Sequence, residues 1–222
     1  MTDCKRPAPE SGTFFITFVI MLPMNFYNRP DVLTIARELL GKIIVTQFDG
    51  IQTSARIVET EAYEGITDRA AHSYGGRRTN RTEIMFGEAG RAYVYLCYGI
   101  HQLFNIVTNE KDIPQAVLIR AAEPIEGIPA MLHRTGKKSA DFTLTRGPGN
   151  VSKALGIRTA HTGHSLMTDE FHIATDNYKP AHIMTSPRIG VDYAGEDALL
   201  PYRFFVKDNR YVSGKMSGNI YL

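Results

Sequence analysis

The sequence has no tryptophan and only two cysteines, Cys4 and Cys97, among its 222 residues. Two cysteines cannot build a thiolate zinc site by themselves. Cys4 lies close to the N-terminus, and Cys97 lies in an expected strand. We therefore interpret both as free thiols, which indicates a reducing compartment and predicts a cytoplasmic location.

The chain also lacks a strong charge of either sign, an internal repeat and a low-complexity tract. Lys and Arg number 25 against 23 Asp and Glu, and the resulting net charge of +2 decides nothing about nucleic acid. Hydrophobic residues make up 43% and charged residues 22%, as in ordinary globular proteins. Because no linker divides it, a chain of this length is expected to fold as one domain.

An apolar run at residues 13–22, TFFITFVIML, is too short for a membrane span, which takes about 20 residues. Lys5 and Arg6 precede it as in a signal peptide, but no small-residue cleavage site follows. We therefore predict that residues 1–23 form an extension outside the fold and that residues 24–222 form the domain. We expect no membrane association.

Hydrophobic periodicity and turn residues predict few helices and many strands joined by hairpins. Asp49-Gly50 and Tyr98-Gly99 are the expected hairpin turns. The expected helices lie at 28–40, 123–133 and 151–155, and the expected strands at 42–48, 52–62, 91–97, 100–107, 115–121, 187–191 and 202–207, with a long loop at 64–90 and irregular structure at 156–185. This pattern favours an α+β fold built on a mainly antiparallel sheet.

One stretch, residues 56–105, gathers the chemically distinctive side chains. It opens with the alternating strand IVETEAY, which places Glu59, Glu61 and Tyr63 on one face. Two carboxylates and a phenol do not suit a hydrophobic core, so this face predicts a site. A carboxylate near a reacting atom can act as a general base, but alternation does not decide between Glu59 and Glu61.

The same stretch contains an unusual number of aromatic side chains, namely Tyr63, His72, Tyr93 and Tyr95. Each of them alone is more typical of a core, but together they can form a slot for a flat ligand. Such a slot attracts a cation through cation–π interactions of about 0.5–2 kcal/mol. A nucleobase is flat, and an alkylated nucleobase can be cationic.

Tyr98 stands at the tip of an expected hairpin, where a large exposed aromatic does not help folding. It is well placed to wedge between base pairs from the minor groove. Enzymes that act on a base must flip it out of the stack, which costs a few kcal/mol. A side chain that fills the resulting gap offsets this cost.

Three arginines of the long loop, Arg77, Arg78 and Arg81, are candidates for contacts with DNA phosphates. The alternative is a solvated basic loop. The glycine-rich segment 147–150 before a helix, with Lys153 beyond it, is a weaker candidate of the same kind.

His161 and His164 have a spacing that hints at a metal pair. No Cys, Asp or Glu stands at ligand spacing before Asp169. We interpret the two histidines as part of a surface loop and expect no metal.

Several segments are long motifs that keep a characteristic order: IVETEAY (57–63), DRAAHS (68–73), GGRRTNR (75–81), MFGEAGRAYVYLCYG (85–99), FN (104–105), LIRAAEP (118–124) and GPGNVSKALGI (147–157). Together they resemble the alkyladenine DNA glycosylase family, the 3-methyladenine glycosylases of the human type, and the chain looks like a bacterial member. The resemblance spans roughly residues 26–206. It implies one compact domain around a curved antiparallel sheet with peripheral helices and a protruding, DNA-intercalating β-hairpin.

The resemblance also implies a role for individual residues. It makes Glu61 rather than Glu59 the general base, and it assigns Arg120 to the support of that base and its water. The other matching positions are Tyr63, His72 and Tyr95 in the base pocket, Asn105 at its entrance and Tyr98 as the intercalating residue.

The implied function is base excision repair. Alkylated or deaminated purines such as 3-methyladenine, 7-methylguanine and hypoxanthine are flipped out of duplex DNA, and a water activated by Glu61 hydrolyses the N-glycosidic bond. We see no lysine nucleophile, and we predict a monofunctional, monomeric enzyme without a cofactor, in which Glu59 is structural. Two alternatives remain: a non-catalytic binder of damaged DNA or structured RNA, which would tolerate loss of Glu61, and a small-molecule nucleosidase, which would not need Tyr98.

Overall fold

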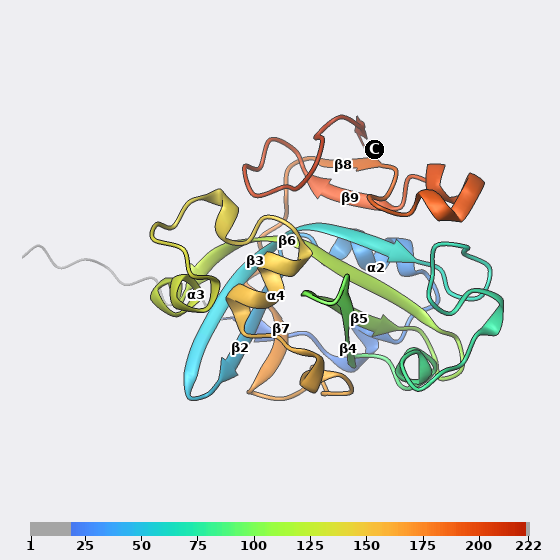
Figure 1. Cartoon of the computed structure of the whole chain (residues 1–222), viewed down its shortest axis with the longest axis horizontal. Coiled ribbons are helices and arrows are strands. Elements are labelled where there is room, and N and C mark those ends of the chain that lie inside the picture. The colour runs from blue at the N-terminus through green and yellow to red at the C-terminus, as the bar shows by residue number, and fades with distance from the viewer. Residues whose placement is uncertain (1–18, 221–222) are drawn as a thin grey trace, which may run out of the picture.

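The computed structural model describes residues 19–220, and its centre is one antiparallel sheet of ten strands (Figure 1). Along the main path the strand order is β1-β7-β2-β3-β6-β5-β4, and β9, β8 and β10 continue from β3. The strands are β1 (Ile20–Met21), β2 (Ile43–Phe48), β3 (Ile51–Tyr63), β4 (Ala92–Cys97), β5 (His101–Thr108), β6 (Gln115–Glu126), β7 (Phe171–Thr175), β8 (Ile183–Ser186), β9 (Arg203–Val206) and β10 (Asn219–Ile220). The predicted α+β fold around a mainly antiparallel sheet is confirmed.

Short helices surround this sheet. Asp31 caps α2, because its carboxylate accepts a hydrogen bond from the backbone N–H of Thr34 at 3.0 Å. α3 and α4 end at Gly136 and Gly156, whose φ angles of 74° and 73° suit a glycine cap. The helices of the described residues are α1 (Met24–Tyr27), α2 (Val32–Glu38), α3 (Ile128–Thr135) and α4 (Pro148–Leu155), with 3-10 turns η1 (Tyr74–Gly76), η2 (Glu83–Phe86), η3 (Phe142–Leu144), η4 (Thr159–His161) and η5 (Asp192–Leu199).

The long strand β3 positions the two carboxylates singled out in the sequence. It starts after the predicted turn Asp49-Gly50, in which both residues have the positive φ of a type I′ hairpin. Its first half pairs with β2, and further along it pairs with β6 on one side and with β9 on the other. Glu59 and Glu61 therefore lie where β3 is hydrogen-bonded on both edges, which fixes their backbone.

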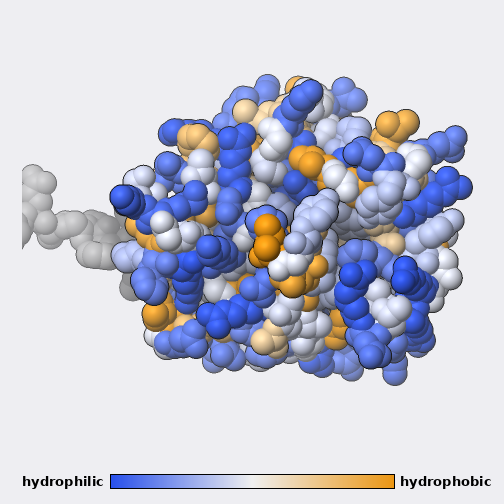
Figure 2. All heavy atoms as spheres, viewed as in Figure 1, coloured by the Kyte–Doolittle hydropathy of each residue, from blue (hydrophilic) through white to orange (hydrophobic). Residues whose placement is uncertain are grey.

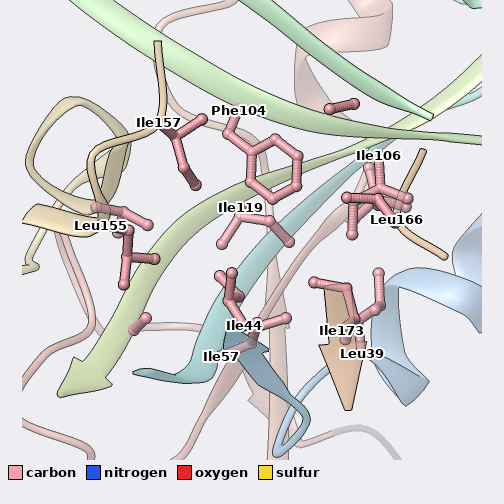
Figure 3. Close-up of a cluster of buried hydrophobic side chains, with 14 of the residues drawn as sticks. Leu39, Ile44, Ile57, Phe104, Ile106, Ile119, Leu155, Ile157, Leu166 and Ile173 are labelled. Carbon is pink, nitrogen blue, oxygen red and sulfur yellow. The ribbon is translucent and has the colours of Figure 1, made fainter. Parts of the chain in front are cut away.

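The main hydrophobic core joins the central strands to α2 and α4 (Figure 3). Full burial of a large apolar side chain in this core contributes about 1.5–3 kcal/mol to the stability of the fold. The last residue of α4, Leu155, is part of this core, so α4 is anchored at its C-terminal end. The strands contribute Ile44, Ile57, Phe104, Ile119 and Ile173, which are all fully buried.

The β4–β5 hairpin is the element that stands out from the sheet (Figure 1). At its tip the carbonyl of Cys97 accepts a hydrogen bond from the N–H of Ile100 at 3.2 Å, and Tyr98 and Gly99 both have positive φ. Tyr98 is 88% exposed. Next to the turn, a Cβ on Gly149 would lie 2.9 Å from the His101 ring, so α4 packs closely against the outer end of the hairpin.

Three expected elements are wrong. Residues 123–126 continue β6 instead of starting a helix, because they pair with β3, and α3 begins only at Ile128. The strand expected at 187–191 lies earlier, as β8. The region 156–185, expected to be irregular, contains β7, which pairs with β2.

The predicted extension at 1–23 falls largely on residues that the structure does not describe, and Cys4 is among them. Ile20 and Met21 form β1 and pair with β7, and Leu22 is buried in the core, so the sheet begins ahead of residue 24. Cys97 is a free thiol, as predicted. Within residues 19–220, no helix is long and apolar enough to cross a membrane.

Candidate active site

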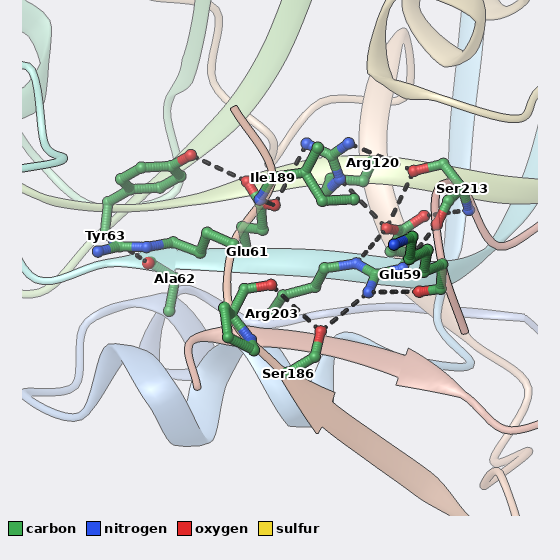
Figure 4. A network of polar contacts seen from close by, with 12 residues as sticks. Glu59, Glu61, Ala62, Tyr63, Arg120, Ser186, Ile189, Arg203 and Ser213 are labelled. Carbon is green, nitrogen blue, oxygen red and sulfur yellow. Dashed lines mark hydrogen bonds and ion pairs between the residues drawn. The ribbon is translucent and has the colours of Figure 1, made fainter. Parts of the chain in front are cut away.

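Glu61 lies near the end of β3, and its side chain is fully buried. Its Oε1 accepts a hydrogen bond from the backbone N–H of Ile189 at 2.8 Å and forms an ion pair with Nη1 of Arg120 at 3.2 Å (Figure 4). Its Oε2 accepts a hydrogen bond from the Tyr63 hydroxyl at 2.9 Å. Oε1 thus has two donors, whereas Oε2 has one and keeps capacity for another.

Glu59 is equally buried, and four protein donors hold its carboxylate. Oε1 accepts from Nε of Arg203 at 2.7 Å, from the Ser213 hydroxyl at 3.0 Å and from Nε of Arg120 at 3.1 Å. Oε2 accepts from the backbone N–H of Ser213 at 2.7 Å. These four contacts fit the predicted structural role of Glu59, because three of them come from Arg203 and Ser213, which line no part of the cavity next to Glu61.

Arg120 on β6 joins the two carboxylates (Figure 4). It is 8% exposed, and burial alone would lower the pKa of its guanidinium. The charges of Glu61 and Glu59 outweigh burial and raise this pKa, so Arg120 remains a cation. With Arg203, the network balances two buried carboxylates with two buried guanidinium groups, as buried charges require.

A cavity of about 350 Å³ lies next to Glu61. The three residues that hold the carboxylate, Tyr63, Arg120 and Ile189, line one wall. The hairpin provides a second wall, and residues 147–150 at the start of α4 provide a third. The volume is in the range of small-molecule sites. The buried carboxylate therefore lies directly behind the wall of a cavity that the outer half of the hairpin lines.

A smaller hollow of about 30 Å³ adjoins this cavity, and Tyr63, Tyr95 and Tyr193 line both. His72 and Asn105 line this hollow as well, so it contains all the side chains that the resemblance assigns to the base pocket and its entrance. We call it the base slot. Its volume is that of about one water molecule, so a purine can enter only when side chains move. The structure thus brings together the four predicted pocket residues.

The rings of His72 and Tyr95 lie 4.6 Å apart at an angle of 78°. Because they are nearly perpendicular, only one of them can stack face-on against a base that lies on Tyr63. Burial lowers the pKa of His72 to about 4, with a further contribution from Arg81 and Arg77, so the imidazole is neutral near pH 7. Its Nδ1 lies 2.8 Å from the hydroxyl of Tyr93.

Asn105 is buried at the base slot, and its orientation is set by the backbone. Its Nδ2 donates hydrogen bonds to the carbonyls of Tyr93 at 3.2 Å and Leu103 at 3.3 Å. Among the described residues, no donor contacts its Oδ1. A base with a suitably placed N–H can therefore be recognised at this position.

Sequence reasoning missed Arg188, which supports Tyr63. Its guanidinium donates to both oxygens of Asp68 at 2.5 and 2.8 Å and to the carbonyl of Ala62 at 2.9 Å. Its Cζ lies 4.8 Å from the Tyr63 ring centroid, within cation–π range. Arg188 lies 120 residues after Asp68, so no local pattern connects them.

Tyr193 was also missed, because it stands in a segment without clear periodicity. Its hydroxyl donates to the carbonyl of Ala70 at 3.0 Å. The side chain thus bridges η5 and the loop that carries His72, at the junction of the cavity and the base slot.

The predicted phosphate-binding residues lie outside the cavity. Arg77 and Arg81 are exposed and form no ion pair among the described residues. Arg78 pairs with Asp112 at 2.7 Å and with Glu83 at 3.4 Å. Lys153 is exposed on α4 and lines a different hollow. Their contact with DNA stays a prediction.

The His161 and His164 pair forms no candidate metal centre. The His161 ring stacks on Phe48 with centroids 4.0 Å apart, and its Nδ1 accepts the backbone N–H of Arg158 at 3.0 Å. In residues 19–220, no three His, Cys, Asp or Glu side chains are grouped as metal ligands would be.

Comparison with known proteins gives a match over most of the chain. The family model described as methylpurine-DNA glycosylase matches residues 25–210. Proteins named "Putative 3-methyladenine DNA glycosylase" from Desulfitobacterium hafniense and Bacillus licheniformis are 48% and 49% identical, over 87% and 86% of this chain and 98% and 96% of their own. One of the same name from Chlamydia abortus is 46% identical over 84% of this chain and 98% of its own.

The comparisons define a DNA glycosylase, an enzyme class that takes part in DNA repair. More specifically, the chain belongs to the methylpurine-DNA glycosylase family. The resemblance and the enzyme class predicted from the sequence motifs are therefore confirmed.

Proposed function

We propose that this protein hydrolyses the N-glycosidic bond of alkylated or deaminated purines in duplex DNA, with 3-methyladenine, 7-methylguanine and hypoxanthine as the expected bases. The observation that carries the proposal is the buried carboxylate of Glu61, whose Oε2 has spare acceptor capacity and which lies beside a cavity lined by an exposed hairpin. The names of the curated relatives support the choice of 3-methyladenine.

Binding begins at the hairpin. Tyr98 at the tip enters the base stack and fills the place of the nucleotide that leaves it, and this offsets part of the unstacking cost. The extrahelical base then passes through the cavity into the base slot. There it lies against Tyr63, with His72 or Tyr95 on its other face, and a cationic base gains from the aromatic faces.

Chemistry requires a water between Glu61 and the anomeric carbon. Oε2 of Glu61 accepts a proton from this water while the water oxygen forms a bond to the anomeric carbon. The bond from the anomeric carbon to the purine nitrogen breaks, and its electron pair leaves with the base. Tyr63 holds the carboxylate, and since burial and the charge of Glu61 raise the pKa of Tyr63 well above its usual range, it remains a hydrogen-bond donor.

A single carboxylate is enough for a cationic purine. Ordinary glycosidases use one carboxylic acid to protonate the leaving group and one carboxylate to activate water. Glu59 is not placed to act as that acid, because its carboxylate is held by Arg203 and Ser213, which do not line the cavity. A methylated, cationic purine departs as a neutral base and needs no acid. The arrangement therefore favours bases that alkylation has already activated.

We further propose a monofunctional enzyme that acts as a monomer and leaves an abasic site. None of the residues that line the cavity is a lysine, so no amine is placed to form a Schiff base there. One chain contains every group that the mechanism uses. A borohydride-trapped adduct with DNA would contradict the first point, and activity restricted to a dimer would contradict the second.

The decisive experiment measures release of free base from duplex oligonucleotides that contain a methylated purine or hypoxanthine. Matched RNA and free nucleosides serve as controls. We expect release from the damaged duplex only, with an intact strand until alkali cleaves the abasic site. Binding without release would identify a damage-binding protein, and release from nucleosides alone would identify a nucleosidase.

A further inference from the structure

A second hollow, of about 520 Å³, lies on the far side of the hairpin and α4 from the candidate active site. Successive side chains of a strand point to opposite faces. On β5, His101 and Leu103 line the active-site cavity, whereas Gln102 between them lines this hollow. We call it the α4 groove; its lining residues are Asp49, Ile51, Gln102, His133, Arg134, Lys153, Gly156, Ile157 and Arg158.

The helix α4 divides the two hollows in the same way. Residues 147–150 at its start line the active-site cavity, while Lys153 and Gly156 near its end line the α4 groove. Together, β5 and α4 form a partition, with the base slot on one side and the α4 groove on the other. Figure 2 shows hydrophilic side chains gathered beside the apolar atoms of the hairpin on this face of the molecule.

The α4 groove has an excess of positive charge. Arg134, Lys153 and Arg158 line it against a single carboxylate, that of Asp49, and none of the three forms an ion pair among residues 19–220. Lys153 only donates to a backbone carbonyl, that of Thr135, at 3.4 Å. The protein therefore neutralises the positive charge of the groove only in part, through Asp49.

The position of Arg134 is built into the fold. Its Nη1 donates to the carbonyl of Ala154 at 3.1 Å and to the hydroxyl of Thr53 at 3.2 Å. A Cβ on Gly156 would lie 2.9 Å from its Cζ, so the guanidinium rests directly on the end of α4. Burial lowers the pKa of Arg134, Asp49 raises it, and the charge of Arg158 lowers it again. An anion in the groove would relieve the repulsion between the two arginines.

We propose that the α4 groove binds backbone phosphates of the DNA duplex that flanks the flipped nucleotide. This inference rests on the proposed function. When Tyr98 is inserted in the base stack, the flipped nucleotide lies on one side of the partition formed by β5 and α4. The DNA backbone next to the inserted Tyr98 then lies on the other side, at the α4 groove. Phosphate contacts there set the position of the duplex on the protein without reading its sequence.

The test compares two double variants of equal net charge. Lys153→Gln/Arg158→Gln removes two positive charges of the α4 groove. Lys179→Gln/Lys207→Gln removes two exposed positive charges that line neither hollow. Binding to an undamaged duplex is measured over a salt series, so that the result does not depend on excision.

Each phosphate contact contributes about 0.9 to the slope of log affinity against log salt. We expect the groove variant to have a shallower slope, by almost 2, and a lower affinity at low salt, and the control variant to keep the wild-type slope. A wild-type slope in the groove variant overturns the proposal, and so does an equal change in both variants. Base release by the wild-type protein is assayed separately. If the groove variant has the shallower slope but the wild-type protein releases no base, the phosphate-binding groove is supported and the proposed function is contradicted.

Discussion

Glu59 and Glu61 are equally buried and share Arg120, yet their oxygens are occupied differently. Strand alternation places both on one face, so the sequence alone could not choose between them. The difference arises from donors that are distant in the chain: Ile189 for Glu61, and Arg203 with Ser213 for Glu59. The groups that hold Glu61 line the cavity, whereas Arg203 and Ser213 do not, and this is a property of the assembled molecule rather than of the strand.

Replacing Glu61 with Gln should abolish most of the excision while leaving DNA binding intact. The amide cannot accept the proton of the water, and general-base catalysis contributes about 10²–10⁴-fold. Single-turnover base release at saturating enzyme, together with the affinity for damaged duplex, measures the two effects. A rate within a few-fold of wild type would assign the base to another residue.

Replacing Glu59 with Gln should reduce stability. The change leaves the buried Arg203 guanidinium without its carboxylate, and removing one partner of a buried ion pair costs about 3–5 kcal/mol. The free energy of unfolding in urea measures the loss. Glu88→Gln removes one exposed carboxylate that pairs with Arg91 and should change little. Equal effects of the two substitutions would contradict the structural role of Glu59.

The β4–β5 hairpin was predicted from local signals. Tyr98-Gly99 between two β-rich segments is enough to place the turn, and the structure has Cys97 opposite His101 on either side of it. Elements whose pairing partners are distant were predicted less well. Residues 123–126 join β6 because β3 offers a long edge, and this edge cannot be seen in the local composition.

Tyr98→Ser should weaken excision from duplex DNA and leave excision from single strands unchanged. Flipping costs a few kcal/mol, and without the wedge this cost returns as about a 10- to 100-fold slower reaction. Single-turnover rates on the paired and the unpaired form of one oligonucleotide separate the effect on base flipping from the effect on bond hydrolysis. Leu96→Ser, at a half-exposed residue of the same hairpin, serves as the control. A duplex rate equal to that of the control variant would rule out the wedge.

The stability of the whole molecule should depend on pH through His72. Because its pKa is about 4 in the folded protein against an ordinary value of 6.5, the unfolded chain binds a proton in this window and the folded protein does not. Stability therefore rises with pH between about 4 and 6.5. Urea unfolding of wild type and His72→Gln over this range should show a smaller rise in the variant.

The difference between the two proteins at each pH isolates His72. It cancels the contribution of His161, whose pKa burial also lowers. Asp176 responds below this window, because Arg56 holds its pKa at about 2. Parallel pH profiles for wild type and variant would show that His72 is free to protonate in the folded state.

The site as a whole was only half visible in the sequence. Glu61, Tyr63, His72 and Tyr95 lie within one stretch, and motif resemblance identified them. The side chains that hold them, such as Arg188, come from more than a hundred residues away. They depend on how β8 and β9 return to β3, and that topology has no local signature.

The two donors from Ser213 to Glu59 have a consequence for the order in which the protein is made. Glu59 leaves the ribosome 154 residues before Ser213, and Arg203 follows it by 144. Until Arg203 and Ser213 are in place, the Glu59 carboxylate lacks three of its four hydrogen bonds. Arg120 is then the only cation beside the two carboxylates Glu59 and Glu61, so the nascent sheet carries an excess negative charge at its centre. The central strands can pair early, but a competent site forms only when the segment beyond residue 210 folds back. A chain cut short there should retain its fold poorly and should not excise bases.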